Sequence, residues 1–586
     1  MKEKEFEILR LIAESRESLT QRVIAAKTGY SLGTVNAIVS DLMSNDMINQ
    51  NYRITSTGLS RLEPYKVDNA IILAAGMSTR FVPISYELPK GLITVKNEVM
   101  IERLIVQLQE AGISDIVLVL GYMMDKFFYL REKYGVKFVV NNEYTIKNTH
   151  SSIFAARDYL SNTYILCSDN YYPDNMFHKY EYRAYYCGIY LEEKCYTERG
   201  FICADDQLVI GTSKPTEKQW IMYGHAYLSK SFSDDYKPIL EQYYNRPGIE
   251  NMYWETIYAE NVDKLHLWLK KCKGSEILEF DSIKELEQFD PDYITYNKIK
   301  IFQNICEVLS CKYSDISGIT PITQGLTNKS FKFTCNGKDY IYRHPGANSN
   351  GIVDRKKERK SLKIAEELKI DETLVFINKS EGWKISKFID VTEEFDFNNK
   401  KHIQLLSNHL KTLHQSKQCV GFDFDYKKEA EKIMKKERFI DALSYQQLKA
   451  IQGKMEPIFQ WLEQNKWQKS FCHNDIYSPN LLISGNTLSI IDWEFAGDND
   501  IGYDICKLFA TQNVPYDEID EWLCYYYGRK TTEEEKLHLL ACAAVIYYYW
   551  YIWSIFAIRN NSDVSEYMIS WYKKMNDYSD EVLRRI

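Results

Sequence analysis

One stretch near the C-terminal end decides whether this chain folds in water or in a membrane. Residues Leu539 to Ile558 contain no charged side chain, and about 20 such residues are enough to cross a bilayer. The stretch also contains three consecutive tyrosines and two tryptophans. These rings prefer the membrane–water boundary, and their polar atoms need hydrogen-bond partners. We therefore expect a helix buried in the core of a folded domain, and no membrane insertion.

The length of the chain requires several cores. Its 586 residues exceed what one hydrophobic core supports, and about 150 residues per domain predicts three or four domains. A net charge of -8 gives no general attraction to nucleic acid or anionic membranes, which favours small-molecule substrates. The thirteen cysteines form no CxxC pair, so neither a disulfide framework nor a thiolate zinc site is expected. With a charged N-terminus that is unlike a secretory signal, these features predict a cytoplasmic protein.

Residues 1 to 65 show the spacing of a helix-turn-helix. Thr20 is placed to cap a helix through Lys27, Gly29 suits the turn, and Ser31 is placed to cap a second helix. On that second helix one apolar face is formed by Val35, Ile38, Val39 and Leu42. With MINQNYRIT after it, the segment resembles winged-helix regulators.

The charge of this segment argues against strong DNA binding. It has eight Lys and Arg against eight Asp and Glu, and no basic residue between Ser31 and Asn45, where the recognition helix would lie. DNA binding requires neutralised phosphates. DNA remains open as a partner beside a docking or regulatory role, and we expect deletion of the segment to leave the functions of the rest of the chain largely unchanged.

Residues 68 to 290 begin with an apolar strand, NAIILAAG, and then alternate helices with strands. This predicts an open α/β sheet that binds a nucleotide at the carboxyl end of its first strand. LAAGMSTRF and the later PKGLITV resemble the sugar-nucleotidyltransferase superfamily. The resemblance implies a Rossmann-like domain in which Ala75, Gly76 and Ser78 bind the CTP phosphates, while Arg80 and Lys90 offset charge on the departing pyrophosphate. Ser78 replaces a glycine of the family pattern.

Two acidic residues follow at positions where this superfamily holds magnesium. Asp169 ends the apolar strand of TYILCSDNYY, and Glu255 lies in NMYWETIY; alone, each is typical of a solvated surface carboxylate. The resemblance implies that together they bind Mg²⁺ against the α-phosphate. Stretches such as IERLIVQLQEAGISDIVLVLGY resemble the phosphocholine cytidylyltransferase branch, and Tyr253 and Trp254 are candidates to bind the phosphocholine cation.

Residues 296 to 586 start again after the turn Asp290-Pro291-Asp292. GLTNKSFKF, DYIYRHPG and DRKKERKSLKIAEEL are similar in order to the small lobe of kinases. That similarity implies that ATP is contacted from the turn, the strand and the helix, by Thr327, Asn328, Arg343 and Glu358.

The strongest motif of this segment is HNDIYSPN, followed by IIDWEFAG. It resembles the HxDxxxxN catalytic loop of kinases, which implies that Asp475 accepts the proton of the substrate hydroxyl while Asn480 and Asp492 hold Mg²⁺. Four polar residues in this order between apolar strands rarely arise as a mere loop. Together the motifs resemble choline/ethanolamine kinases, which implies a bilobal, protein-kinase-like fold.

Aromatic residues supply a reason to expect choline. A quaternary ammonium group donates no hydrogen bond, so its site needs aromatic faces and a nearby carboxylate. Trp550 and Trp553 match a WxxW pair of choline kinases, and Tyr477 and Phe495 lie within the catalytic motifs. The competing interpretation is a packed aromatic core.

The combined prediction is a multidomain α/β and α+β enzyme that makes CDP-choline. Choline is phosphorylated by ATP, and phosphocholine then takes a cytidylyl group from CTP with release of pyrophosphate. The alternatives are the same two reactions on ethanolamine, a sugar kinase fused to a sugar nucleotidyltransferase, and a regulator with inactive domains. The last alternative is disfavoured because Asp169 and Asp475 are both present. A homodimer remains open.

Overall fold

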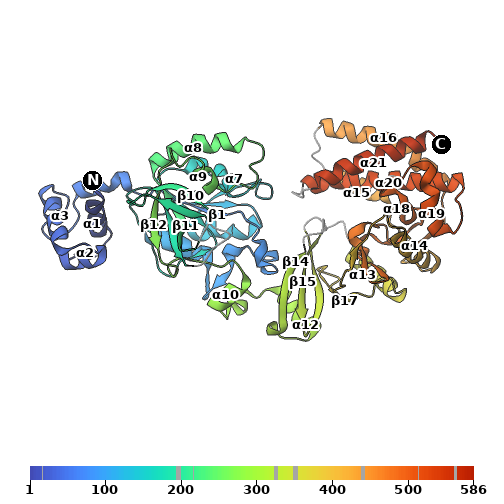
Figure 1. The fold of residues 1–586 in the computed structure, drawn as a ribbon, viewed down its shortest axis with the longest axis horizontal. Helices are drawn as coiled ribbons and strands as arrows, with labels where there is room; N and C mark the ends of the chain where they lie inside the picture. Colours follow the sequence, from blue (N-terminus) through green and yellow to red (C-terminus); the bar gives the residue numbers. More distant parts are fainter. Residues whose placement is uncertain are drawn as a thin grey trace. The chain divides into compact units, whose positions relative to one another are not determined.

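The computed structural model describes all residues except 16, 193–198, 215–216, 323–327, 347–353, 437–441, 513 and 560–563. The chain divides into two compact units, Met1–Ile301 and Phe302–Ile586, coloured blue to green and yellow to red in Figure 1. The first unit contains the winged-helix segment and the nucleotidyltransferase segment. The second contains the kinase segment from residue 302 onward.

The N-terminal segment forms four helices, α1 (Glu3–Glu14), α2 (Gln21–Thr28), α3 (Leu32–Ser44) and α4 (Ser56–Leu62). The expected caps are present: Thr20 accepts a hydrogen bond from the amide of Val23, and Ser31 accepts one from the amide of Thr34. Gly29 adopts a left-handed conformation with φ of 73°, which glycine adopts without steric cost. The structure therefore has the winged helix-turn-helix fold that the sequence predicts.

A mixed sheet forms the centre of the nucleotidyltransferase segment. Its strand order is β10-β9-β11-β6-β1-β4-β5, and β8 pairs with β11 and β12. The bounds are β1 (Asn69–Ala74), β4 (Ile116–Leu120), β5 (Lys137–Val140), β6 (Thr163–Cys167), β8 (Tyr185–Leu191), β9 (Gly200–Cys203), β10 (Val209–Ser213), β11 (Gln219–Leu228) and β12 (Trp268–Cys272). Because β1 is parallel to both β4 and β6, the loop after β1 and the end of β6 meet at one edge of the sheet.

Helices cover both faces of this sheet (Figure 1). Successive residues of β1 belong to different cores, Ile72 to the one that includes α5 (Met100–Glu110) and Ile71 to the one that includes α8 (Lys230–Tyr244) and α9 (Trp254–Ala259). A strand buried on both faces explains why β1 is apolar throughout. This is the expected Rossmann-like architecture.

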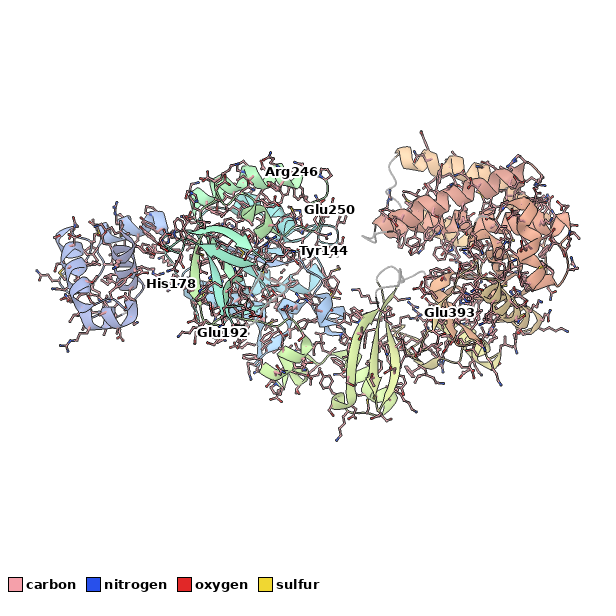
Figure 2. All side chains as sticks on the ribbon, in the orientation of Figure 1. Tyr144, His178, Glu192, Arg246, Glu250 and Glu393 are labelled. Carbon is pink, nitrogen blue, oxygen red and sulfur yellow. The ribbon has the colours of Figure 1, made fainter. Side chains whose placement is uncertain are left out.

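The winged helix packs against the sheet domain within the first unit. The Tyr65 and Tyr182 rings stack with centroids 5.7 Å apart, and the Phe6 ring lies 5.3 Å from the Tyr182 ring. Glu14 accepts a hydrogen bond of 3.0 Å from the amide of Lys179 and lies 3.1 Å from the ring of His178, which Figure 2 labels. Helix α1 is therefore part of the packing of this unit.

The kinase segment has two lobes. The small lobe is a sheet of order β14-β15-β16-β18-β17 with the helix α13 (Arg355–Glu367), where the strands are β14 (Ile316–Ile322), β15 (Asn328–Cys335), β16 (Lys338–Pro345), β17 (Leu374–Ile377) and β18 (Lys384–Lys387). The large lobe is mainly helical and includes α14 (Lys400–Gln415), α15 (Tyr426–Lys436), α18 (Lys507–Ala510), α19 (Ile519–Tyr527), α20 (Glu533–Arg559) and α21 (Ser565–Leu583). Between its helices β21 (Leu481–Ser484) and β22 (Thr487–Ile490) form a hairpin that connects the two catalytic motifs.

Helix α20 contains the charge-free stretch. Among the described helices it alone has the length and composition to cross a membrane, and 83% of its most apolar window is buried inside the protein. It packs against α15 and α21. The expectation of a core helix agrees with this burial.

Candidate active sites

The loop after β1 lines a cavity of about 540 Å³ in the first unit. Ala75, Gly76, Ser78 and Arg80 all line it, and a Cβ atom placed on Gly76 would meet no protein atom within 4 Å. The space beside this glycine therefore belongs to the cavity. Ser78 has φ of 50°, the left-handed region that glycine enters most easily, which explains why the superfamily pattern has glycine here.

Lys90 and Asp169 form the central charged pair of this cavity. Lys90 Nζ lies 2.8 Å from an Asp169 carboxylate oxygen, and the lysine side chain is only 7% exposed. Burial alone would lower the pKa of Lys90, but Asp169, with Glu279 and Asp281 nearby, raises it above its usual value. The next residue, Gly91, lies so close to Ser168 that a Cβ atom would approach the Ser168 side chain to 2.8 Å. Glycine therefore allows the chain that carries Lys90 to pass this close to the end of β6.

The other predicted residues of this domain separate into two groups. Tyr253 lines the cavity and is 53% exposed. Trp254 is 3% exposed and stacks on Tyr186 with ring centroids 5.7 Å apart. The prediction that Trp254 faces a substrate is therefore at odds with the structure, because α9 buries this side chain in the core of the sheet domain.

Glu255 is held by a tyrosine beside the same sheet edge. Its carboxylate accepts a hydrogen bond of 3.0 Å from the Tyr186 hydroxyl. Burial raises the pKa of the Cys167 thiol, and the carboxylates of Asp169, Glu279 and Glu255 raise it further. Three acidic side chains thus surround the end of β6, although Glu255 itself is not among the residues that line the cavity.

Sequence reasoning missed Glu279 and Asp281. Glu279 lies on β13 (Leu278–Glu279), which pairs with β7 (Asn170–Tyr171) directly after Asp169. Asp281 forms an ion pair of 2.6 Å with Arg80. The only local signal was the acidic stretch EFDSIKELE, and strand pairing across more than a hundred residues brings it beside Lys90 and Arg80, which line the cavity.

The kinase segment encloses a second cavity of about 540 Å³ between the small-lobe sheet and the large-lobe helices. Asn328, Arg343, Asp475, Asn480 and Asp492 all line it. Thr327 lies outside the described residues. The side-chain amide of Asn480 donates a hydrogen bond of 3.1 Å to Asp475 Oδ2, which orients the carboxylate predicted to act as base.

A buried ion-pair network closes the small-lobe side of this cavity. Arg343 on β16 lies 2.7 Å from Glu358 on α13 and 3.0 Å from Asp492. Burial alone would raise the pKa of Glu358, but Arg343 and its neighbours lower it to about 2. Glu358 does not line the cavity. It contacts Arg343, so its effect on ATP would be through the orientation of that guanidinium.

A histidine and an aspartate hold the HNDIYSPN loop in place through hydrogen bonds. The Asp475 amide donates to His473 Nδ1 at 3.2 Å, and His473 Nε2 donates to the Ile491 carbonyl at 2.9 Å. Asp504, which the sequence analysis did not single out, accepts hydrogen bonds of 2.8 Å from the amides of His473 and Asn474. His473 is therefore structural: it holds Asp475 and Asp492 at a fixed spacing.

Aromatic rings form one wall of the kinase cavity. Trp550 and Trp553 lie on α20 with ring centroids 5.5 Å apart, and Phe495 lies 5.6 Å from Trp550. Tyr477 lines the same cavity. Helix α21 adds Trp571, with its centroid 5.6 Å from that of Trp550. The four predicted aromatic residues are thus brought together, and Trp571 and its neighbour Tyr567 were missed because a separate helix supplies them.

Family models match the chain in three consecutive segments. Residues 1–49 match "Winged helix-turn-helix DNA-binding", residues 70–173 match "MobA-like NTP transferase domain", and residues 319–544 match "Choline/ethanolamine kinase".

Individual relatives cover the two larger segments. The chain is 31% identical to a choline-phosphate cytidylyltransferase of Streptococcus pneumoniae over 38% of this chain and 96% of that one. It is 33% identical to a 2-aminoethylphosphonate cytidylyltransferase of Lancefieldella rimae over 39% of this chain and 93% of that one. The crystal structure of choline kinase LicA from Streptococcus pneumoniae aligns with 19% identity and a TM-score of 0.42, covering 48% of this chain and 98% of that one.

Proposed function

Since the chain belongs to the family of the choline-phosphate cytidylyltransferases and also contains a choline/ethanolamine kinase domain, we propose that it converts choline to CDP-choline in two steps. The kinase domain forms phosphocholine from choline and ATP. The nucleotidyltransferase domain then forms CDP-choline and pyrophosphate from phosphocholine and CTP. The order of the two reactions follows from their chemistry, because the product of the first is the substrate of the second.

One observation carries the kinase assignment: Asp475 faces the same cavity as the aromatic wall. A cation held against the faces of Trp550 and Trp571 has its hydroxyl end free to point toward Asp475. Asp475 accepts the hydroxyl proton while the alcohol oxygen attacks the γ-phosphorus of ATP, and ADP leaves with the electrons of the broken bond. Arg343, positioned by Glu358, contacts the ATP phosphates.

The cytidylyltransferase chemistry is assigned to the loop after β1 and to Lys90. A phosphate oxygen of phosphocholine attacks the α-phosphorus of CTP, and pyrophosphate leaves with the bonding electrons. The loop of Ala75, Gly76 and Ser78 surrounds the phosphates with backbone N–H groups. Lys90 and Arg80 offset the negative charge that develops on the departing pyrophosphate.

The residues at and beside the two cavities fit magnesium. Asn480 and Asp492 present amide and carboxylate oxygens in the kinase cavity, and Asp169 and Glu255 present carboxylates near the end of β6. Oxygen ligands of this kind are the ones that Mg²⁺ takes in phosphoryl- and nucleotidyl-transfer sites. When bound, the ion would neutralise charge on the reacting phosphates.

Choline is favoured over its nearest alternatives by the surroundings of each site. A sugar kinase would need polar groups where the aromatic wall lies. In the nucleotidyltransferase domain, the exposed ring of Tyr253 lines the cavity and offers an aromatic face to a cationic head group. Ethanolamine and 2-aminoethylphosphonate also carry an ammonium group, and aromatic faces discriminate between them and choline because a quaternary ammonium group has no N–H to hydrogen-bond.

Product analysis tests the proposal. The purified protein is incubated with CTP, ATP and Mg²⁺ and with choline, ethanolamine or 2-aminoethylphosphonate in separate reactions. CDP-choline and pyrophosphate are expected, with choline as the preferred acceptor by kcat/KM. If only the ethanolamine or the phosphonate conjugate forms, that compound is the substrate and the assignment of choline is wrong. Absence of any nucleotidyl product would refute the proposed function.

A further inference from the structure

Five cationic side chains line the kinase cavity: Arg343, Lys384, Lys387, Lys507 and Lys574. Protein acceptors hold most of them. Arg343 pairs with Glu358 and Asp492 as described above, and Lys384 lies 3.7 Å from Glu358. Lys387 donates a hydrogen bond of 3.1 Å to the carbonyl oxygen of Glu372.

Lys574 on α21 is also bonded to the protein. Its ammonium group donates hydrogen bonds to the carbonyl oxygens of Ala510 and Thr511 at 3.3 and 2.5 Å. Burial, together with the nearby charge of Lys507, lowers the pKa of Lys574 to about 8. Lys574 therefore serves the packing of α21 against the end of α18.

Lys507, the first residue of α18, differs from the other four. It is 9% exposed, and among the described residues no hydrogen bond or ion pair joins its Nζ to a protein group. Its contact with the face of Tyr547, 5.4 Å from the ring centroid, supplies no oxygen or nitrogen acceptor. The side chain is largely buried while Lys507 lines the cavity, so the acceptor for its ammonium group is expected to come from the cavity.

The charge of Lys507 and the charges around it indicate the chemical class of the ligand that supplies this acceptor. Burial lowers its pKa, while Cys506, Asp475 and Asp504 raise it in part. Lys507 thus lies within electrostatic range of the catalytic carboxylate, on the side of the cavity from which α20 supplies the aromatic wall. A positive charge there repels a quaternary ammonium group and attracts an anion.

We propose that Lys507 forms a phosphate-binding subsite on the acceptor side of the kinase cavity, where its ammonium group binds the phosphate of the phosphorylated alcohol. The subsite rests on the kinase reaction proposed above. As the alcohol oxygen bonds to the γ-phosphorus, the bond to the bridging oxygen of ADP breaks and the proton passes to Asp475. The new phosphate then lies among Asp475, Asp492 and Glu494, and Lys507 supplies the charge that stabilises it.

Two substitutions in the full-length protein test the subsite. Lys507→Met keeps the length of the side chain and removes its charge, so kcat for phosphocholine formation should fall roughly 10- to 100-fold, as loss of a charge-assisted hydrogen bond to a phosphate predicts. The KM for choline should change by less than about threefold, because the aromatic wall binds the cation. Lys507→Arg should recover most of kcat.

A binding measurement separates this subsite from the proposed function. Phosphocholine is titrated calorimetrically into the protein with ADP and Mg²⁺, and Lys507→Met should weaken binding about tenfold or more. Lys573→Met, an exposed lysine on α21, is the matched charge control and should leave binding unchanged. If the wild type binds phosphocholine but does not phosphorylate choline, the reaction fails and the subsite stands.

Three results of these measurements would bear against the subsite or require another variant. If kcat and the affinity for phosphocholine stay within about twofold of the wild type in Lys507→Met, no phosphate contact exists. If the variant loses thermal stability and Lys507→Arg fails to restore kcat, Lys507 is a packing residue. Should Lys507→Met fail to fold, Lys507→Gln replaces it in the same measurements.

Discussion

At the scale of single residues, the protonation of Asp475 sets when the kinase can work. Burial and the neighbouring Asp492 raise its pKa to about 8, while Lys507 acts in the opposite direction. Below this pH the carboxyl already holds a proton and cannot accept one from the alcohol. The kcat/KM for choline should therefore rise with pH, by up to about tenfold per unit, and level off above about pH 8.

The measurement is the pH dependence of phosphocholine formation between about pH 6 and about pH 9.5 at fixed ATP and Mg²⁺. Because Asp492 contributes to the raised pKa of Asp475, more Mg²⁺ at Asp492 should move the rise to lower pH. Cytidylyl transfer, followed in parallel by release of pyrophosphate, is the internal control since it does not use Asp475. A kinase activity that stays constant down to pH 6 would contradict this role for Asp475.

The aromatic wall makes a second prediction at the same scale. Trp550→Ala or Trp571→Ala should remove a cation–π contact of about 1 to 2 kcal/mol and raise the KM for choline roughly tenfold, with little change for ATP. Trp467→Ala is the control, because the Trp467 ring stacks on His538 at 3.9 Å and does not line the cavity. An unchanged KM in both cavity variants would assign these tryptophans to packing alone.

At the scale of helices and strands, the sequence predicts what is contiguous and misses what packing brings together. The apolar run of β1 and the motif HNDIYSPN each lie within a few residues, so their strand, loop and polar side chains could be recognised locally. Trp571 and Lys507 lie on helices with no motif of their own, and only the packing of α21 and α18 against α20 brings them to the cavity. Trp254 was misassigned because it stands beside Glu255 in the sequence, and periodicity over so short a helix does not give the orientation of its side chain.

Helix α1 leads to a revised expectation for the N-terminal segment. Phe6 is 1% exposed and packs on Tyr65 and Tyr182 of the same unit, so residues 1 to 65 are not a separate appendage. Phe6→Ala should destabilise the first unit by about 3 kcal/mol or more. Deletion of residues 1 to 65 should lower the temperature at which cytidylyl transfer is lost. Kinase activity should stay unchanged.

These effects are measured by thermal unfolding and by the loss of each activity after graded heating. Phe128→Ala, an exposed phenylalanine of the first unit, is the control for removing a ring and should have little effect. Equal thermal loss of cytidylyl transfer in the full-length and shortened proteins would instead indicate that α1 contributes no stability. A role for α3 in docking or regulation is then tested separately from this structural one.

At the scale of the whole molecule, each unit has its own core and its own cavity, and the proposed base Asp475 and the proposed metal ligand Asp169 lie in different units. Asp475→Ala should therefore abolish phosphocholine formation and leave cytidylyl transfer to supplied phosphocholine nearly intact, and Asp169→Ala should do the reverse. Loss of both activities in either variant, with the fold preserved, would refute independent sites.

Mixing the two variants extends this test to the intermediate. Phosphocholine is small and soluble, so an equal mixture of Asp475→Ala and Asp169→Ala proteins should form CDP-choline from choline, ATP and CTP. CDP-choline formation by the mixture should begin after a lag, while phosphocholine accumulates in solution to near its KM for cytidylyl transfer. The wild type would show a shorter lag only if it transfers phosphocholine between its two sites before releasing it. The time course of CDP-choline, with and without added phosphocholine, measures both. If the mixture never forms CDP-choline and the Asp169→Ala protein makes only one phosphocholine per kinase site, the intermediate does not leave the kinase domain. The two sites would then have to be coupled within one chain.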